Sequence, residues 1–229
     1  MIGILCALDI ELRHLQERLT QAGTQRVMGF DVHVGNLEGQ KVALVQCGVG
    51  KVNAALCCQT LLMRYEPTLI INSGVAGSLN RELEILDVAV ARDVVQHDVD
   101  TTALGDPPGM VSTVNVTYFP CDPVVSQGIL SVVASMPNLR GKAARIATGE
   151  QFVTSAQRKR EIVDLFHADA CDMEAGAIAQ ACYIAGVPCA VIRAISDATD
   201  DSHQMEYPAF AAKAADHAAS VLTRYLSTL

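Results

Sequence analysis

Residues 68–74 read TLIINSG, a continuous apolar run that ends in small residues. Such a run is typical of a strand whose two faces are both covered by helices, as in the largely parallel sheets of α/β proteins. The runs IGILCA at 2–7 and PCAVIRAIS at 188–196 have the same character. The sequence therefore predicts three buried strands that lie far apart along the chain.

Outward from these strands, helical and extended patterns alternate over the 229 residues. Leucines at 8, 12, 15 and 19 recur at helical spacing and predict a helix over 8–20. Further helices are predicted over 51–64, from 122 or 123 to 135, and over 155–166, 174–185 and 206–226, with strands over 30–36, 41–47, 87–95, 142–148 and 168–173. We expect one domain over 1–229, a three-layer α/β/α fold with a central twisted mixed sheet.

The charge balance bears on which partners this chain can bind. It carries 17 basic and 25 acidic residues, for a formal net charge of −8. A chain of this sign repels a phosphate backbone, so we expect no nucleic-acid partner. A small neutral or cationic ligand is compatible with the same balance.

Eight cysteines are present, several of them inside apolar runs, and no two form a C-x-x-C pair. The pattern favours buried free thiols in a reducing compartment over a zinc or redox centre. The N-terminus lacks the basic region of a signal peptide, and no apolar stretch approaches the ~20 residues of a membrane helix. We expect a cytoplasmic protein with no membrane association, no metal and no cofactor.

Several well-known motifs fail on inspection. Gly48-Val49-Gly50 is followed by Asn53 where a dinucleotide fingerprint needs its third glycine, and Gly50-Lys51-Val52 lacks the Ser or Thr of a phosphate-binding loop. Neither G-x-S-x-G nor H-E-x-x-H occurs. The sequence therefore lacks the motifs that would indicate a dinucleotide-binding protein, a nucleotide triphosphatase, a serine hydrolase or a zinc protease.

Carboxylates and small residues gather instead at the ends of the predicted strands, where ligands collect in α/β sheets. They are Leu8, Asp9 and Glu11, the turn at 74–77, the segment 149–153, Asp172, Met173 and Glu174, and Ser196 and Asp197. Breaking a sugar–base bond through an oxocarbenium-like transition state needs an acid, a base that positions water, and a carboxylate near the ribose. Taken singly, Glu11 is explained by the dipole of its helix and Asp197 by a turn, so only their joint occurrence favours a site.

Four strings in the chain resemble the purine nucleoside phosphorylase/nucleosidase superfamily. They are GVGKVNAA (48–55), INSGVAGSL (71–79), CDMEAGAIA (171–179) and RAISDATDDSH (193–203). Within it they look like the 5′-methylthioadenosine/S-adenosylhomocysteine nucleosidases, over nearly the whole chain. The resemblance implies a nucleoside phosphorylase-like fold and hydrolysis of the N-glycosidic bond of methylthioadenosine and S-adenosylhomocysteine.

The resemblance also implies roles for individual residues. Asp197 would be the general acid that protonates the imidazole-ring nitrogen of adenine, and Glu11 would hold and deprotonate the attacking water. Glu174 would bind the ribose hydroxyls. The other implied substrate-binding residues are Met173 against the sugar, Phe152 stacked on the base, Val153 reading its polar edge through the backbone, Leu8, Val49 and Val75 nearby, and Arg193 and Ser196 supporting Glu174 and Asp197.

The acceptor distinguishes the two branches of the superfamily. Phosphorylases of this fold place an arginine just before the glycine turn that follows the buried strand, whereas this chain reads Ile71-Asn72-Ser73-Gly74. Their first strand leads into a phosphate-binding loop, whereas this chain offers Glu11. A carboxylate at that position repels phosphate, so we expect water as the acceptor.

The family resemblance also implies that residues 98–117 cross to a neighbouring subunit and close the pocket for the 5′ substituent. The matching residues are Thr101, Leu104 and Asp106. They lack the aromatic side chains common there, which leaves the 5′ group open. If the segment crosses, the active unit is a homodimer, and the small residues of 48–58 suit a tight two-fold interface.

Three alternatives remain open from the sequence. The first is a phosphate-dependent purine nucleoside phosphorylase. The second is a nucleosidase for another adenine nucleoside, such as aminodeoxyfutalosine or 5′-deoxyadenosine. The third is a non-catalytic nucleoside-binding protein, which would not need both Glu11 and Asp197.

Overall fold

The computed structural model describes residues 1–197 and 207–229 of the chain, with the backbone alone at Tyr207. The strands are β1 (Ile2–Cys6), β2 (Thr20–Val27), β3 (Phe30–Leu37), β4 (Gln40–Gln46), β5 (Leu69–Ser78), β6 (Val88–Gln96), β7 (Tyr118–Pro120), β8 (Gly141–Thr148), β9 (Ala170–Asp172) and β10 (Cys189–Asp197). The helices are α1 (Asp9–Gln16), α2 (Lys51–Tyr65), α3 (Pro123–Ser135), α4 (Ala156–Phe166), α5 (Ala175–Ala185) and α6 (Tyr207–Leu226), with a 3₁₀ turn at Thr102–Leu104.

One mixed sheet of ten strands runs through the molecule in the order β10-β6-β8-β9-β5-β1-β4-β3-β2, with β7 paired to β6. Strand β5 also pairs in parallel with β10, so β5, β9, β8, β6 and β10 form a closed ring of hydrogen-bonded strands. The strands β1, β4, β5 and β10 are parallel to their neighbours in this set, which brings their carboxyl ends to one edge. Ligands in α/β proteins bind beyond such an edge.

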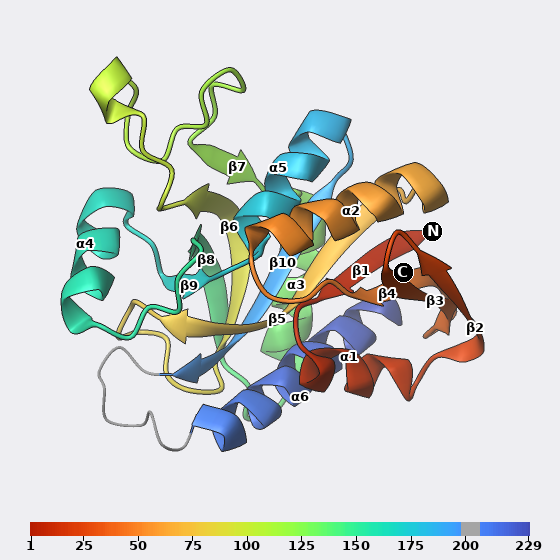
Figure 1. Cartoon of the computed structure of the whole chain (residues 1–229). Coiled ribbons are helices and arrows are strands. Elements are labelled where there is room, and N and C mark those ends of the chain that lie inside the picture. Colours follow the sequence, from red (N-terminus) through yellow and green to blue (C-terminus); the bar gives the residue numbers. More distant parts are fainter. Residues whose placement is uncertain (198–206) are drawn as a thin grey trace.

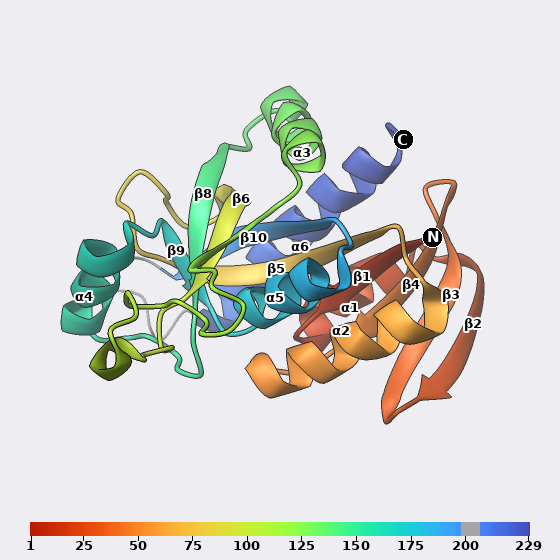
Figure 2. The same cartoon turned by 90° about the horizontal axis from the view of Figure 1, so that it is seen from above.

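Helices cover both faces of this sheet, as Figures 1 and 2 show: α2 and α5 lie on one side, and α1, α3 and α6 on the other. Neighbouring residues of β1 supply the two faces, since Leu5 belongs to the core under α2 and α5, whereas Ile4 belongs to the core under α1, α3 and α6. Helix α4 covers a third, smaller cluster at one end of the molecule. The expected three-layer α/β/α architecture with a mixed sheet is confirmed.

The structure differs from the prediction in the segment that follows the first helix. The helix predicted over 8–20 ends at Gln16, and the chain enters β2 at Thr20. Strand β2 went unpredicted because its sequence, TQAGTQRV, is exposed along almost its whole length and has no apolar alternation. It is an edge strand held by pairing to β3, so its backbone partners rather than its side chains define it.

Strand β5 is longer than predicted, running to Ser78 through the residues 74–77 that the sequence suggested as a turn. Strand β7, at the end of the long 98–117 segment, was also missed. The start of the last helix at Glu206, and residues 198–203 of the string RAISDATDDSH, lie outside the described residues. Among the helices of the described ranges, none is long and apolar enough to cross a lipid bilayer.

Candidate active site

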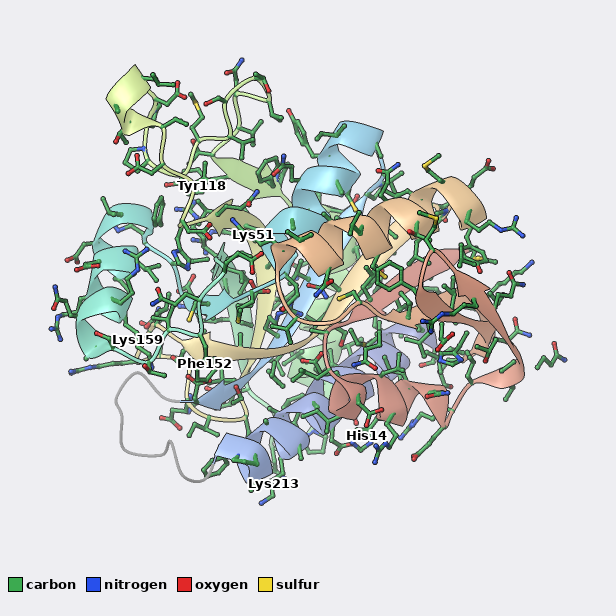
Figure 3. The ribbon with its side chains drawn as sticks, viewed as in Figure 1. His14, Lys51, Tyr118, Phe152, Lys159 and Lys213 are labelled. Carbon is green, nitrogen blue, oxygen red and sulfur yellow. The ribbon has the colours of Figure 1, made fainter. Side chains whose placement is uncertain are left out.

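A cavity of about 370 Å³ opens at the carboxyl ends of β1, β5, β9 and β10. Its lining residues are Ala7, Leu8, Glu11, Val49, Val75, Ala76, Gly77, Phe152, Cys171, Asp172, Met173, Glu174, Ser196 and Asp197. Figure 3 shows Phe152 at this edge of the sheet. The cavity therefore brings together side chains from both ends of the chain, including Glu11 and Asp197.

Glu11 lies in the first turn of α1 and is 4% exposed. Its Oε2 accepts hydrogen bonds from the N–H groups of Ala7 at 2.7 Å and Leu8 at 2.9 Å, and its Oε1 accepts one from Val75 at 2.9 Å. Burial raises the pKa of Glu11, and the charge of Arg193 and these three N–H groups oppose that rise. The backbone that follows β1 and the backbone of β5 thus fix the carboxylate in one orientation.

Asp197 ends β10 and faces the same cavity. The hydroxyl of Ser196 donates to its Oδ1 at 2.9 Å, and Nζ of the buried Lys159 lies 3.9 Å from its Oδ2. Burial raises the pKa of Asp197, against the opposing effects of Ser196 and Lys159. A carboxyl group with a raised pKa holds its proton toward neutral pH, as a general acid must.

Two glycines of β5 make room for these carboxyl groups. A Cβ atom on Gly74 would lie 2.5 Å from Oε1 of Glu11, and a Cβ atom on Gly77 would lie 2.8 Å from Oδ2 of Asp197. Both glycines are needed for close approach, since any larger residue would push a carboxyl group from its place. The two contacts are three residues apart on β5, a separation of roughly 10 Å along a strand.

Glu174 caps the start of α5 and is 6% exposed. The N–H of Gly50, at the start of α2, donates to its Oε1 at 2.9 Å. Burial and the nearby Asp172 raise the pKa of Glu174 to about 7, while Arg193 and the Gly50 bond oppose this. The other oxygen of Glu174 carries no hydrogen bond from the described residues and is left for a ligand.

Arg193, for which the resemblance implies a supporting role, does not itself line the cavity. Its guanidinium is 2% exposed and donates from Nε and Nη2 to Oδ2 of Asp172, at 2.9 and 2.6 Å, and from Nη2 to Asn72. Asp172 in turn accepts from Thr148 and from the N–H of Ala175. Arg193 therefore supports Glu174 indirectly, through its charge and through the strand that precedes α5.

The remaining predicted contacts are divided between two cavities. Met173, Leu8, Val49 and Val75 line the main cavity. Val153 does not, but it lines a smaller adjoining cavity of about 20 Å³ that shares Phe152, Met173 and Asp197 with the main one. Phe152 is 54% exposed and borders both cavities, so it lies where a planar ligand could stack.

The 98–117 segment projects beyond the body of the molecule in Figure 1, and Thr101, Leu104 and Asp106 do not line the cavity of their own chain. Asp106 is occupied in shaping the segment, since its Oδ2 accepts hydroxyl hydrogen bonds from Ser112 at 2.6 Å and Thr101 at 2.7 Å. Leu104 is 82% exposed at the tip. The three residues thus lie away from the cavity of their own chain, with Leu104 exposed and the other two half-buried.

Sequence reasoning missed several contributors to this site. The most important are Asn72 and Lys159, and the backbone N–H groups that hold Glu11. Asn72 and Arg193 are both polar residues inside apolar strands, and their pairing could have been inferred from that shared anomaly. Lys159 lies on the otherwise polar α4, so nothing in the sequence marked it as buried. No cluster of metal-binding side chains occurs in the parts of the chain described.

Comparisons with known proteins agree with this geometry. Residues 1–227 match the Phosphorylase superfamily. The chain is 36% identical, over 230 aligned positions covering 100% of both chains, to a 5′-methylthioadenosine/S-adenosylhomocysteine nucleosidase of Staphylococcus aureus (strain MRSA252).

Solved structures give the same picture. One is the 5′-methylthioadenosine/S-adenosylhomocysteine nucleosidase of Neisseria meningitidis in complex with methylthio-immucillin-A, with TM-score 0.95, 28% identity, and coverage of 100% of this chain and 99% of that one. Another is the futalosine hydrolase of Helicobacter pylori strain 26695, with TM-score 0.93, 31% identity, and coverage of 100% and 97%. The chain therefore belongs to the phosphorylase superfamily, and within it to the family of the 5′-methylthioadenosine/S-adenosylhomocysteine nucleosidases.

Proposed function

We propose that this chain hydrolyses the N-glycosidic bond of 5′-methylthioadenosine and S-adenosylhomocysteine, releasing adenine and the 5′-thioribose product. One observation carries the proposal. Two carboxyl groups, the buried Glu11 and the half-buried Asp197, face a single cavity and differ in what holds them. Three N–H groups hold Glu11 and one hydroxyl holds Asp197.

The proposed chemistry divides the proton transfers between these groups. Asp197 donates its proton to the imidazole-ring nitrogen of adenine while the bond from the sugar to the base breaks and its electron pair moves onto the base. Water held by Glu11 attacks the resulting oxocarbenium-like carbon, and its proton passes to Glu11. Glu174 grips the ribose hydroxyls and its charge stabilises the positive sugar.

Water rather than phosphate fits the charge around Glu11. None of the described residues that line the cavity is an arginine or a lysine. A phosphate dianion in place of the water would meet the carboxylate of Glu11 with no cation in the cavity lining to bind it. This argues against the phosphorylase alternative.

The 5′ substituent is the least constrained part of the substrate. The futalosine hydrolase among the structural relatives keeps open a preference for another adenine nucleoside. Adenine release should therefore be measured in phosphate-free buffer with methylthioadenosine, S-adenosylhomocysteine, 5′-deoxyadenosine and aminodeoxyfutalosine. Release from the first two without phosphate supports the proposal. Strict dependence on phosphate, or binding without release, would replace it with the phosphorylase or the non-catalytic alternative.

We also propose that the active unit is a homodimer in which residues 98–117 of one chain complete the cavity of the other. An exposed apolar stripe on α2 supports this, since Val52, Leu56 and Met63 are 70%, 57% and 75% exposed. Sedimentation should give twice the mass of the 24.4 kDa chain. Leu56→Asp should lower both the mass and the activity, and an active monomer would refute the arrangement. The unpaired, buried cysteines support a reducing, cytoplasmic setting.

A further inference from the structure

We propose that Lys51, Asp98 and Glu150 form a polar clamp that positions the sugar- and base-contacting segments of the cavity without touching the substrate. The mechanism above uses none of the three. The inference rests on the proposed function, because its effect is measured on that reaction. Lys51 is labelled at the start of α2 in Figure 3.

The three residues form a closed set of hydrogen bonds between segments far apart in sequence. Nζ of Lys51 donates to Oδ1 of Asp98 at 2.6 Å. Oδ2 of Asp98 accepts the N–H of Glu150 at 2.9 Å, and Oε1 of Glu150 accepts the N–H of Lys51 at 2.6 Å. The clamp therefore ties together the start of α2, the segment after β6 and the loop after β8.

One arm of the clamp leads to the sugar-binding carboxylate. Gly50, whose N–H donates to Glu174, directly precedes Lys51. Gly50 has a φ of +96°, and a Cβ atom on it would lie 2.7 Å from Oε2 of Glu150. The glycine turn is thus pressed against the clamp on one side and bonded to Glu174 on the other. A shift of Lys51 or Glu150 would carry the Gly50 N–H away from Glu174.

The other arm leads to the base. Glu150 lies two residues before Phe152, in a loop between β8 and α4 that has no regular secondary structure. The position of such a loop depends on side-chain and tertiary contacts, because it lacks the repeating backbone hydrogen bonds of a helix or a strand. The bond from the Glu150 N–H to Asp98 anchors it next to the aromatic ring that borders the cavity.

The ion pair between Lys51 and Asp98 is partly buried, which strengthens the clamp. The side chains of Lys51 and Asp98 are only 18% and 27% exposed, so their charge-assisted bond is partly shielded from water. Burial raises the pKa of Asp98, but the bonds from Lys51 and from the Glu150 N–H outweigh it, and the pKa lies below its usual value. Asp98 therefore stays ionised over the whole range in which the enzyme is expected to work.

The clamp is separate from the groups that hold the catalytic carboxyls. Glu11 depends on the N–H groups of Ala7, Leu8 and Val75, and Asp197 depends on Ser196. Loosening the clamp should therefore weaken binding of sugar and base while leaving the proton transfers in place. The expected signature is a rise in KM that exceeds any fall in kcat, because Glu174 stays in the cavity with its charge while its grip on the ribose loosens.

The experiment compares steady-state adenine release by Lys51→Met, Asp98→Asn and Glu150→Ala with that of the unaltered chain. Lys142→Met is the matched control, because Nζ of Lys142 makes a 2.7 Å bond to Glu82 away from the cavity. We expect KM to rise about tenfold in each clamp variant, the size of one lost charge-assisted hydrogen bond, with kcat within about threefold. Glu150→Gln should keep KM close to that of the unaltered chain, since its amide oxygen can still accept the hydrogen bond from the Lys51 N–H.

A double variant sharpens the test. If Lys51 and Asp98 act as one unit, Lys51→Met/Asp98→Asn should raise KM no further than the larger single change. An unchanged KM in all folded clamp variants of an active enzyme would overturn the proposal, as would a fall in kcat at constant KM. If Lys51→Met does not fold, Asp98→Asn and Glu150→Ala decide the matter. No adenine release from the unaltered chain would overturn the proposed function itself, a result distinct from an active enzyme with an indifferent clamp.

Discussion

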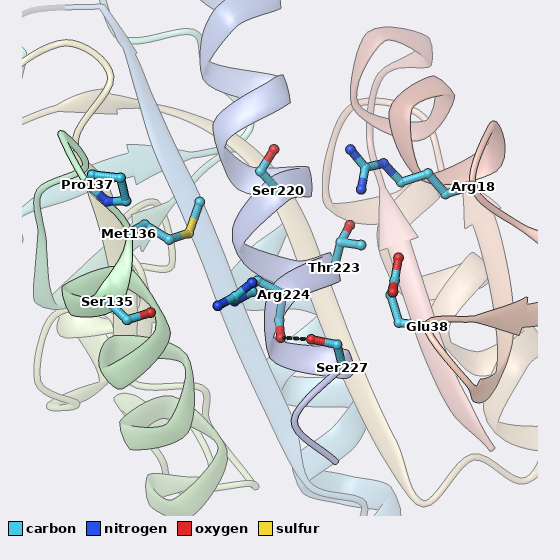
Figure 4. Close-up of a pocket in the computed structure, with 9 residues that line it drawn as sticks. All are labelled: Arg18, Glu38, Ser135, Met136, Pro137, Ser220, Thr223, Arg224 and Ser227. Atoms are coloured by element: carbon cyan, nitrogen blue, oxygen red, sulfur yellow. Dashed lines mark hydrogen bonds between the residues drawn. The ribbon is translucent and has the colours of Figure 1, made fainter.

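Two cavities of the same volume, about 370 Å³ each, lie in different parts of the fold, one beyond the strand ends of the active site and the other along the C-terminal part of α6. The second, shown in Figure 4, is a groove lined by Arg18, Glu38, Ser135, Met136, Pro137, Ser220, Thr223, Arg224 and Ser227. Its charged side chains are all exposed, whereas Glu11 and Glu174 in the active-site cavity are buried. The volume of a cavity therefore does not distinguish these two sites, whereas the presence of buried carboxylates in the cavity lining does.

The two cavities also differ in what holds their polar groups. In the groove, the hydroxyls of Ser135, Thr223 and Ser227 donate to carbonyl groups of their own helices. In the active-site cavity, Glu11 accepts two hydrogen bonds from the backbone just before its own helix and a third from Val75 of the distant strand β5. The hydroxyls of the groove are each satisfied within one helix, whereas the orientation of Glu11 also depends on a strand from a distant part of the chain.

The largest expected effect comes from removing either proposed catalytic carboxyl. Glu11→Gln and Asp197→Asn should each lower the rate of adenine release at least ~10²-fold, the usual size of one acid or base contribution. Arg18→Gln and Glu38→Gln, in the groove, are the matched controls and should leave the rate unchanged. Equal losses of activity in the carboxyl variants and in the groove variants would contradict the distinction between the two cavities.

The glycines of β5 give the next largest effect. Gly74→Ala places a methyl group against Glu11 and should reduce adenine release by roughly tenfold or more, as expected for a small displacement of a catalytic group. Gly23→Ala on β2 is the control, because nothing lies within 4 Å of its Cβ position. Full activity in Gly74→Ala would show that the position of Glu11 tolerates displacement.

A buried carboxyl with a pKa of about 7 should also reduce stability as pH rises. The pKa of a glutamate in an unfolded chain is about 4.3, whereas that of Glu174 in the folded chain is about 7. Between these two pH values the folded state binds more protons than the unfolded state, so the free energy of unfolding falls as pH rises. Glu174→Gln removes this dependence. The free energy of unfolding of this variant, relative to that of the unaltered chain, should increase by about 3 kcal/mol between pH 4.5 and 8 in urea unfolding. A pH-independent difference would contradict the assignment.

The smallest expected effect lies in the groove. Arg224 occupies the last turn of α6, where a cation is favoured by the helix dipole. Arg224→Gln should lower the free energy of unfolding by about 0.3–1 kcal/mol and leave adenine release unaltered. A loss of activity in this variant would give the groove a function that its geometry does not suggest.

The sequence was most informative for strands that are buried on both faces, because such strands are apolar along most of their length. Strands such as β1, β5 and β10 are apolar because both their faces are covered, and their ends could be located to within a few residues. The exposed β2 carries no such pattern, and it was missed. In the site, the acidic residues were visible as exceptions at strand ends, but the partners of Arg193 and the burial of Lys159 depend on contacts between distant elements.

The most direct test is a crystal structure of the Asp197→Asn variant with methylthioadenosine bound. The account predicts the adenine ring beside Phe152 with its imidazole nitrogen at residue 197, the ribose hydroxyls on Glu174, and a water molecule on Glu11 below the sugar. A nucleoside bound in the groove of Arg18 and Arg224, or bound in the cavity with its sugar remote from Glu11, would contradict it.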